Sequence, residues 1–191
     1  MVHPFETLIK SARIESYQRP DQFSEIREGG RENLKIRLAT NADSENIKNL
    51  VYSVLQEYSL APDPQATDRD LDDIEGNYLN NNGYFIVVED NGRLIACMGL
   101  FRVNADTCEL RKMYALPVAR GKGLGKTLMD RAITQARELG YSRMILETAS
   151  PLKEAITLYR KYGFTPFQPT HLSCRCDQAF ELALNNRESE I

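Results

Sequence analysis

The feature that most constrains this fold is a strand-like run that leads through a glycine-rich turn into an amphipathic helix. Residues 107–116 form the strand-like run, and Pro117 ends it. From Leu124, apolar residues recur at helical spacing as far as Leu139, and Gly140 then stops the helix. A strand joined to a helix by a short turn predicts a layered fold, in which helices pack on a sheet.

The segments on either side of this unit supply further strands and helices. Residues 90–92, Asp-Asn-Gly, are a tight-turn signal between two apolar runs, so residues 84–101 are predicted to form a hairpin. Ser150 and Pro151 suit the cap and first turn of a helix. The other predicted elements are strands over residues 34–39, 143–148, 164–168 and 178–184, and helices over residues 47–55, 68–81 and 152–162. Strands that pair first as neighbours and then alternate with helices predict a mixed sheet with helices on both faces.

The composition excludes several classes of protein. The chain has 191 residues, of which 42% are hydrophobic, so we expect one domain with a sizeable core. Residues 1–33 are polar and are predicted to be an N-terminal extension, and residues 34–191 are predicted to form the domain. The net charge of −3 argues against a nucleic-acid partner. No apolar run is long enough to span a membrane, and the N-terminus lacks the apolar centre of a signal peptide, so we expect a cytoplasmic protein without a membrane partner.

The cysteines do not form the pattern of a metal site. Cys97 and Cys108 lie in apolar runs and are predicted to be small core residues. Cys174 and Cys176 form one pair without a second pair, and the chain has only two histidines. Because structural zinc usually takes four cysteine or histidine ligands, no metal site is predicted.

The glycine-rich turn allows three interpretations. It ends in Gly-Lys-Thr like a nucleotide-binding P-loop, but a P-loop needs glycine five positions before Gly125, where Arg120 stands. Three glycines at the start of a helix also leave backbone N–H groups free to bind another phosphate. Five basic residues and no acidic one lie between Leu110 and Met129, which favours an anion. A solvated basic turn without a ligand is the third interpretation.

Two motifs together resemble a known family. Residues 120–125, Arg-Gly-Lys-Gly-Leu-Gly, fit the pattern Arg/Gln-x-x-Gly-x-Gly/Ala, and they follow the strand 109–117. Downstream lie residues 145–149 and then 155–164, Ala-Ile-Thr-Leu-Tyr-Arg-Lys-Tyr-Gly-Phe. In this order and spacing the motifs resemble the GNAT superfamily of acyl-CoA-dependent acyltransferases, over about residues 34–184. The resemblance implies an α/β (α+β) fold with a mixed, mostly antiparallel sheet of about six to seven strands and a central splay between strands 107–116 and 143–148.

The resemblance also implies acetyl-CoA as the acyl-donor cosubstrate, without a metal. The backbone of the turn would hold the pyrophosphate, and the strand before it would lie beside the pantetheine arm and the thioester. An N–H near Met113 would stabilise the oxyanion that forms during acyl transfer. The cofactor-binding residues implied are Met113, Tyr114, Ala115, Arg120, Gly121, Lys122, Gly123, Leu124, Gly125 and Lys126.

Three side chains are implied as catalytic residues. Tyr159 matches the tyrosine that protonates the leaving thiolate in many family members, although its place on an apolar helix stripe also fits simple packing. Glu109 and Glu147 are alternative general bases for the ammonium of the acceptor. Each is also explained as a solvated or salt-bridged carboxylate, with Arg111 or Arg143 as the partner.

The reaction implied is direct attack of a primary amine on the thioester through a tetrahedral intermediate. The acceptor is a small-molecule or peptide amine, and a homodimer is compatible with the family. The acidic run over residues 68–75 either favours a cationic amine or is a solvated helix face. Two functions from other classes stay open, namely a non-catalytic acyl-CoA-binding module or sensor and a nucleotide-binding protein.

Overall fold

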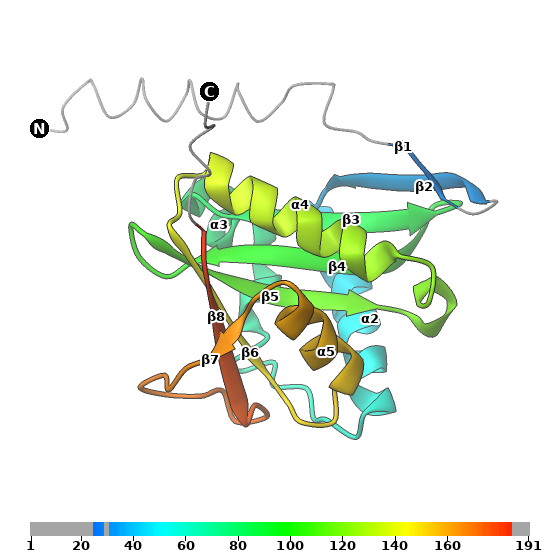
Figure 1. Ribbon diagram of the computed structural model, residues 1–191. Helices are drawn as coiled ribbons and strands as arrows, with labels where there is room; N and C mark the ends of the chain where they lie inside the picture. The colour runs from blue at the N-terminus through cyan, green and yellow to red at the C-terminus, as the bar shows by residue number, and fades with distance from the viewer. Residues whose placement is uncertain (1–24, 29–30, 185–191) are drawn as a thin grey trace, which may run out of the picture.

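The computed structural model describes residues 25–28 and 31–184, which form one mixed sheet with helices on both faces (Figure 1). The strands are β1 (Glu25–Glu28), β2 (Arg31–Leu38), β3 (Tyr84–Asp90), β4 (Arg93–Arg102), β5 (Thr107–Ala115), β6 (Arg143–Thr148), β7 (Thr165–Pro166) and β8 (Gln178–Ala183). The helices are α2 (Ser44–Glu57), α3 (Ile74–Asn77), α4 (Leu124–Glu138) and α5 (Lys153–Lys161).

The sheet confirms the predicted fold class. Its strand order is β1-β2-β3-β4-β5-β6-β8-β7, and every neighbouring pair is antiparallel except β5 and β6. The described part of the chain thus has eight strands where about six to seven were predicted. The extra strand is β1, which lies in the segment predicted as an extension, and β7 is only two residues long.

The predicted boundary between an extension and the domain, at residues 33 and 34, falls inside β2. This strand begins at Arg31 and pairs with both β1 and β3. Residues 1–24 lie outside the described residues, so the division of the chain into two parts stays a prediction.

The two faces of the sheet carry separate hydrophobic cores. Helix α2 covers one face with Ile47, Val51 and Leu55, all fully buried. Helices α4 and α5 cover the other face, where Leu128 and Tyr159 belong to the same core (Figure 1). The amphipathic pattern of each helix explains this arrangement, because its apolar stripe must be covered. The two cysteines predicted as core residues, at positions 97 and 108, are both buried.

Strand β5 contains a bulge. Cys97 pairs with Tyr114 and Gly99 pairs with Arg111, so one residue of β4 lies opposite two residues of β5, Lys112 and Met113. Lys112 has a φ of 53°, in the left-handed region that a lysine rarely adopts. The bulge also interrupts the alternation of side chains along β5. As a result, the consecutive residues Arg111 and Lys112 both reach Asp70 on the α2 face.

Two local predictions were wrong. Residues 68–81 do not form one helix. Two short 3-10 turns, Arg69–Asp72 and Leu79–Asn81, flank the single turn α3. The break comes at Asp73, whose backbone leaves the helical region and whose side chain accepts the Gly76 N–H.

Ser150 does not cap α5, which begins at Lys153. The Ser150 N–H donates to Asp177, and the Ser150 hydroxyl accepts from Gln178. The residue is therefore bound to the start of β8 instead of to the helix that follows it.

Candidate active site

The candidate site lies where the two parallel strands of the sheet separate. Strands β5 and β6 pair at only three positions, the last being Glu109 with Ile145, and then diverge, while β6 stays paired with β8 along its whole length. This is the predicted central splay. A cavity of about 340 Å³ opens beyond the last pair. Its lining includes residues 109–114 of β5, residues 147–149 at the end of β6 and just after it, Leu152, Ala155 and Tyr159 near α5, and residues from the loops around positions 66 and 173.

The cavity connects the two faces of the sheet. Along β6, Met144 and Leu146 point into the α4 core, so Glu147 points to the opposite face. On β5, Leu110 belongs to the α4 core and Glu109 likewise faces away from it. One half of the cavity is therefore lined by carboxylates, and the half beneath α5 is lined by Tyr159 and apolar side chains.

Glu109 lies at the base of the splay. Its Oε2 atom accepts hydrogen bonds from Arg111 Nε at 2.7 Å and from Arg111 Nη2 at 2.5 Å. The Glu109 side chain is only 12% exposed, and its burial raises the pKa of Glu109 above the ordinary value even though Arg111 opposes this shift. A carboxylate with a raised pKa in a cavity is a better proton acceptor than one at the surface.

Glu147 faces the same half of the cavity. Its Oε2 atom accepts a hydrogen bond from the Ser173 N–H at 2.9 Å and another from the Ser173 hydroxyl. Among the described residues, no hydrogen bond or ion pair involves its Oε1 atom, so the second oxygen of this carboxylate is available to a ligand.

Tyr159 lines the other half of the cavity. It is 7% exposed and packs against Phe164, with ring centroids 5.9 Å apart. No atom of the described chain makes a hydrogen bond with its hydroxyl. Burial raises the pKa of Tyr159 above that of a free phenol, so the group is protonated at neutral pH and can donate. Packing and proton donation, the two roles expected for this residue, are compatible in this position.

The bulge brings the backbone of β5 to the cavity. Met113 and Tyr114 both line it, whereas Ala115 does not. Because Met113 lies in the bulge, its N–H is displaced from the regular ladder with β4. The Ala115 carbonyl instead accepts a hydrogen bond from Arg120 Nε at 2.8 Å. Of the three predicted β5 positions, the structure therefore brings two to the cavity.

The glycine-rich turn lies beyond the end of β5 and leads into α4. Gly121 has a φ of 75° and Gly123 a φ of 85°, conformations that favour glycine. Gly123 precedes the first residue of α4, and no side chain caps this end of the helix. The N–H groups of Leu124, Gly125 and Lys126 are the ones that an α-helix leaves without an intrahelical acceptor.

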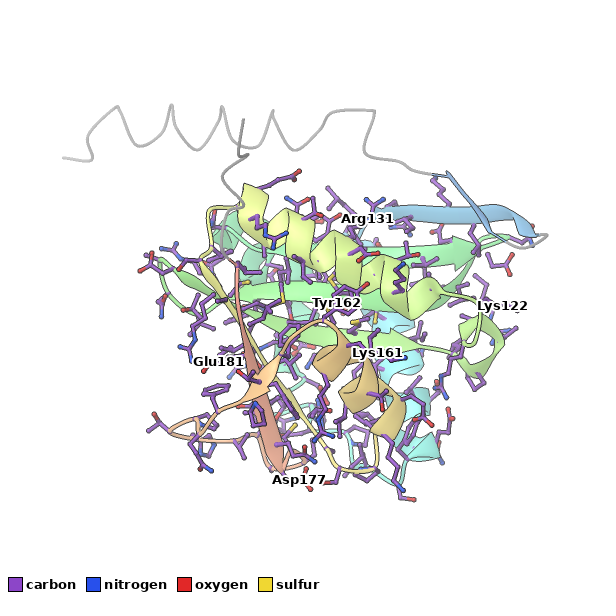
Figure 2. All side chains as sticks on the ribbon, in the orientation of Figure 1. Lys122, Arg131, Lys161, Tyr162, Asp177 and Glu181 are labelled. Carbon is purple, nitrogen blue, oxygen red and sulfur yellow. The ribbon has the colours of Figure 1, made fainter. Side chains whose placement is uncertain are left out.

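The basic side chains of the turn differ in their surroundings. Arg120 forms a two-bond ion pair with Glu57 at the end of α2, at 2.5 and 2.9 Å, so it fixes the turn to that helix. Lys122 and Lys126 are exposed, and Lys122 extends into solvent at the tip of the turn (Figure 2). The turn thus offers free N–H groups and positive charge at a helix N-terminus, which is an anion-binding arrangement.

A family model described as the acetyltransferase (GNAT) family matches residues 49–164, more than half of the chain. The chain belongs to the GNAT family. It is an acyl-CoA-dependent acetyltransferase, as the relatives named N-acetyltransferase indicate. The uncharacterized N-acetyltransferase YjgM of Escherichia coli (strain K12) is 40% identical over 134 residues, which cover 68% of this chain and 80% of that protein. An uncharacterized N-acetyltransferase of Schizosaccharomyces pombe is 31% identical over 129 residues, covering 66% of this chain and 79% of that protein.

Solved structures share the fold of this acetyltransferase. A GNAT-family acetyltransferase from Staphylococcus aureus Mu50 has a TM-score of 0.75 at 23% identity, and the match covers 80% of this chain and 100% of that chain. The yncA protein of Salmonella typhimurium, solved with acetyl-CoA, has a TM-score of 0.63 at 23% identity, covering 82% of this chain and 96% of that chain.

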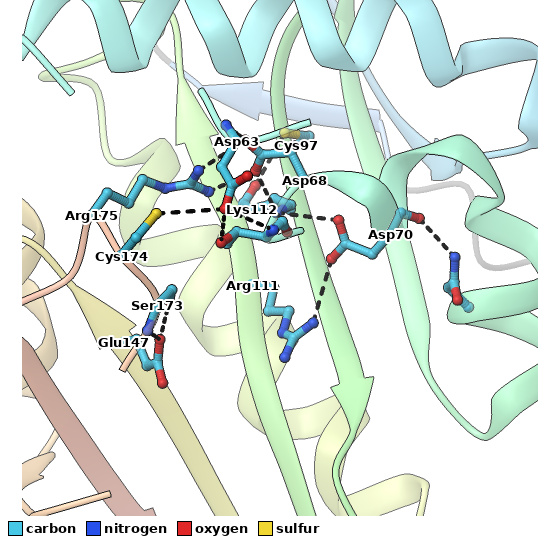
Figure 3. Close-up of polar contacts among 12 residues, drawn as sticks. Asp63, Asp68, Asp70, Cys97, Arg111, Lys112, Glu147, Ser173, Cys174 and Arg175 are labelled. Carbon is cyan, nitrogen blue, oxygen red and sulfur yellow. Dashed lines mark hydrogen bonds and ion pairs between the residues drawn. The ribbon is translucent and has the colours of Figure 1, made fainter. Parts of the chain in front are cut away.

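Sequence reasoning missed two features of the candidate site. A buried cluster of charges joins Asp68 and Asp70 to Lys112 and Arg175 beside the cavity (Figure 3). Thr148 also lines the cavity, and its Oγ1 atom is buried without a hydrogen-bond partner among the described residues. A lysine inside the predicted strand 107–116 and the acidic run over residues 68–75 are local signs of the cluster, and nothing local indicates the burial of Thr148.

The described residues contain no cluster of three or more histidine, cysteine, aspartate or glutamate side chains arranged to hold a metal ion. No helix in the same part of the acetyltransferase is long and apolar enough to cross a membrane.

Proposed function

We propose that the protein transfers an acetyl group from acetyl-CoA to a primary amine by direct attack, through a tetrahedral intermediate. The observation that carries this proposal is the cavity at the splay. Two carboxylates line one side of it, a protonated phenol lines the other, and the bulged backbone of β5 lies between them. These are the groups needed to deprotonate an ammonium, stabilise an oxyanion and protonate a leaving thiolate.

The residues of the turn fit the phosphates of coenzyme A. Gly121 and Gly123 give the backbone its left-handed turns, and the free N–H groups of residues 124–126 are suited to a diphosphate. Leu152 and Ala155 give the α5 side of the cavity the apolar character that suits a pantetheine arm. Bound acetyl-CoA supplies the acetyl group as an activated thioester.

The chain's own residues would divide the chemistry as follows. Glu109, directly or through water, accepts a proton from the ammonium of the acceptor so that the amine can attack. The Met113 N–H donates a hydrogen bond to the acyl oxygen as negative charge develops there. The Tyr159 hydroxyl donates a proton toward the sulfur as the thiolate leaves.

The half of the cavity lined by Glu109 and Glu147 is proposed to bind the acceptor amine and is called the acceptor half. Glu147 is its second carboxylate. With one oxygen occupied by Ser173, it is suited to hold the ammonium in place while Glu109 serves as the base. The acceptor is proposed to be a small-molecule or peptide amine. A homodimer and a cytoplasmic location stay predictions, as does the absence of nucleic-acid, membrane and metal partners.

Two measurements test this function. A thermal shift experiment compares acetyl-CoA, coenzyme A and ATP with magnesium, since a ligand that binds the native state raises the melting temperature. We expect stabilisation by both coenzyme forms and none by ATP; stabilisation by ATP alone would support a nucleotide-binding protein. Thiol release is then followed with a panel of primary amines. Stabilisation without amine-dependent thiol release, in a panel that includes diamines, amino acids and short peptides, would support a non-catalytic acyl-CoA-binding module.

A further inference from the structure

A buried charged cluster joins three segments of the chain beside the cavity (Figure 3). Its centre is Asp68, whose side chain is fully buried. Lys112 of the β5 bulge approaches one carboxylate oxygen at 2.7 Å, and Arg175 of the loop before β8 binds both oxygens, at 2.6 and 2.8 Å. The Asp63 N–H donates to the same carboxylate at 2.9 Å. Asp68 therefore connects the loop after α2, the bulge and the loop before β8.

The first arm of the cluster holds the bulge. The Lys112 side chain is 3% exposed, and its ammonium also donates to the Thr67 carbonyl at 2.7 Å and lies 3.2 Å from Asp70. Its backbone is left-handed, which is unfavourable for a lysine, so the side-chain contacts must compensate for that conformation. The next residue along is Met113, whose N–H is the proposed oxyanion donor.

The second arm holds the wall of the acceptor half. The Arg175 side chain is 8% exposed, and its two-bond pair with Asp68 anchors the loop that also carries Ser173. Ser173 in turn binds the Glu147 carboxylate. The position of the proposed ammonium-binding carboxylate thus depends on the same loop that Asp68 anchors.

We propose that Asp68 is a positioning residue. It holds in place both the Met113 N–H, the proposed oxyanion donor, and the loop whose Ser173 binds Glu147. This inference rests on the proposed acetyl transfer. Asp68 itself touches neither substrate. It acts through Lys112 on one side and through Arg175 on the other, so the two halves of the site are assembled by a single carboxylate.

Charge accounting explains why one residue can do this. Three cations, Lys112, Arg175 and Arg111, meet three carboxylates, Asp68, Asp70 and Glu109, and the set is balanced. Neutralising Asp68 leaves three cations with two carboxylates, and Lys112 and Arg175 are the two that lose a direct partner. Because an unpaired buried cation is strongly unfavourable, both side chains are expected to move toward water and to release the bulge and the loop.

The first test replaces Asp68→Asn and compares it with Asp72→Asn as a matched control. Asp72 lies in the same acidic run, but its side chain is 58% exposed and pairs with Lys48 on the surface. For Asp68→Asn we expect kcat to fall about 10- to 100-fold, because a small misplacement of reacting groups has effects of this size. The acetyl-CoA dissociation constant, measured by calorimetry, should change less than twofold, because the phosphate turn is untouched. Unchanged kcat in folded Asp68→Asn would refute the proposal.

A double-mutant cycle tests whether Asp68 acts through Lys112. If it does, Asp68→Asn combined with Lys112→Met should lower kcat little more than either change alone. Losses that multiply would show that the two residues act independently, against the proposal. If Asp68→Asn does not fold, Arg175→Lys serves instead, because it keeps the charge but loses the two-bond geometry. We expect a lower kcat with unchanged acetyl-CoA affinity, and an unchanged kcat would count against the proposal.

Amide hydrogen exchange separates failure of this inference from failure of the proposed function, since it needs no acceptor. In Asp68→Asn, amide exchange should become faster at residues 111–114 and 171–177, while exchange in β3 is unchanged. In Arg175→Lys, the faster exchange is expected in the loop over residues 171–177. Faster exchange in the loop after α2 alone would refute the connection between the three segments. A wild-type protein that transfers acetyl to no amine in the panel would refute the proposed function, whatever the exchange result.

Discussion

At the scale of single residues, the first prediction concerns the Tyr159 hydroxyl, which is proposed to protonate the leaving thiolate. Its ring fills the core beneath the cavity while its hydroxyl has no partner in the described chain. Tyr159→Phe keeps the packing and removes only the proton donor. We expect kcat to fall about 10- to 100-fold, within the range typical of a general acid, while the melting temperature changes little. Wild-type kcat in Tyr159→Phe, measured by thiol release, would leave packing as the role of this residue.

The role of Glu109 as general base predicts how the reaction rate depends on pH. A general base must be ionised, so activity is lost as pH falls through its pKa. Because burial raises the pKa of Glu109, the loss should begin above the pH at which an exposed glutamate titrates. Glu109→Gln should lower kcat/KM and remove this acid limb. Glu147→Gln should move the limb to lower pH, since the Glu147 charge also raises the Glu109 pKa. An acid limb that persists in Glu109→Gln would assign the base elsewhere.

At the scale of elements, two glycines make a matched pair. Gly121 in the turn before α4 and Gly92 in the β3–β4 hairpin have φ values of 75° and 79°, and an added Cβ would meet no heavy atom within 4 Å at either position. Alanine should therefore cost about 1 kcal/mol of unfolding free energy at both, because of the left-handed backbone alone. Only Gly121→Ala should weaken coenzyme A binding, since only this turn is proposed to hold the diphosphate. If calorimetry gave both alanine variants the same coenzyme A affinity, the turn would not be part of the coenzyme A site.

At the scale of the whole molecule, the Asp68 cluster links distant segments and should make stability depend on pH. Burial alone would raise the pKa of Asp68, but Arg175 and Lys112 outweigh it and lower the pKa from 3.8 to about 2. The stabilisation is therefore fully present above pH 3.8 and is lost as pH falls toward 2. This difference corresponds to about 2 kcal/mol. Urea unfolding between pH 7 and pH 2 should show a smaller loss of stability in Asp68→Asn than in the wild type. Equal losses would contradict the predicted linkage.

The sequence by itself determined most elements of this protein and the family to which it belongs. The hairpin over residues 84–101, helix α4 and strand β6 follow from signals that lie within the element, such as a turn dipeptide, a glycine at a helix end or a regular apolar spacing. The motif at residues 120–125 is local in the same way. Local backbone preference and side-chain periodicity are sufficient here because each element meets the core with the face that its own pattern provides.

Only the tertiary structure decided the status of the buried charges. Within the acidic run, Asp68 resembles a surface residue, and Lys112 resembles the outward side chain of a strand. The structure buries both because Asp68 meets Lys112 across 44 residues and Arg175 across 107 residues. Likewise, Ser150 is of a residue type that often caps helices, but it forms hydrogen bonds with Asp177 and Gln178 instead. The free energy of a buried charge depends on partners that only folding brings together, so no local pattern encodes it.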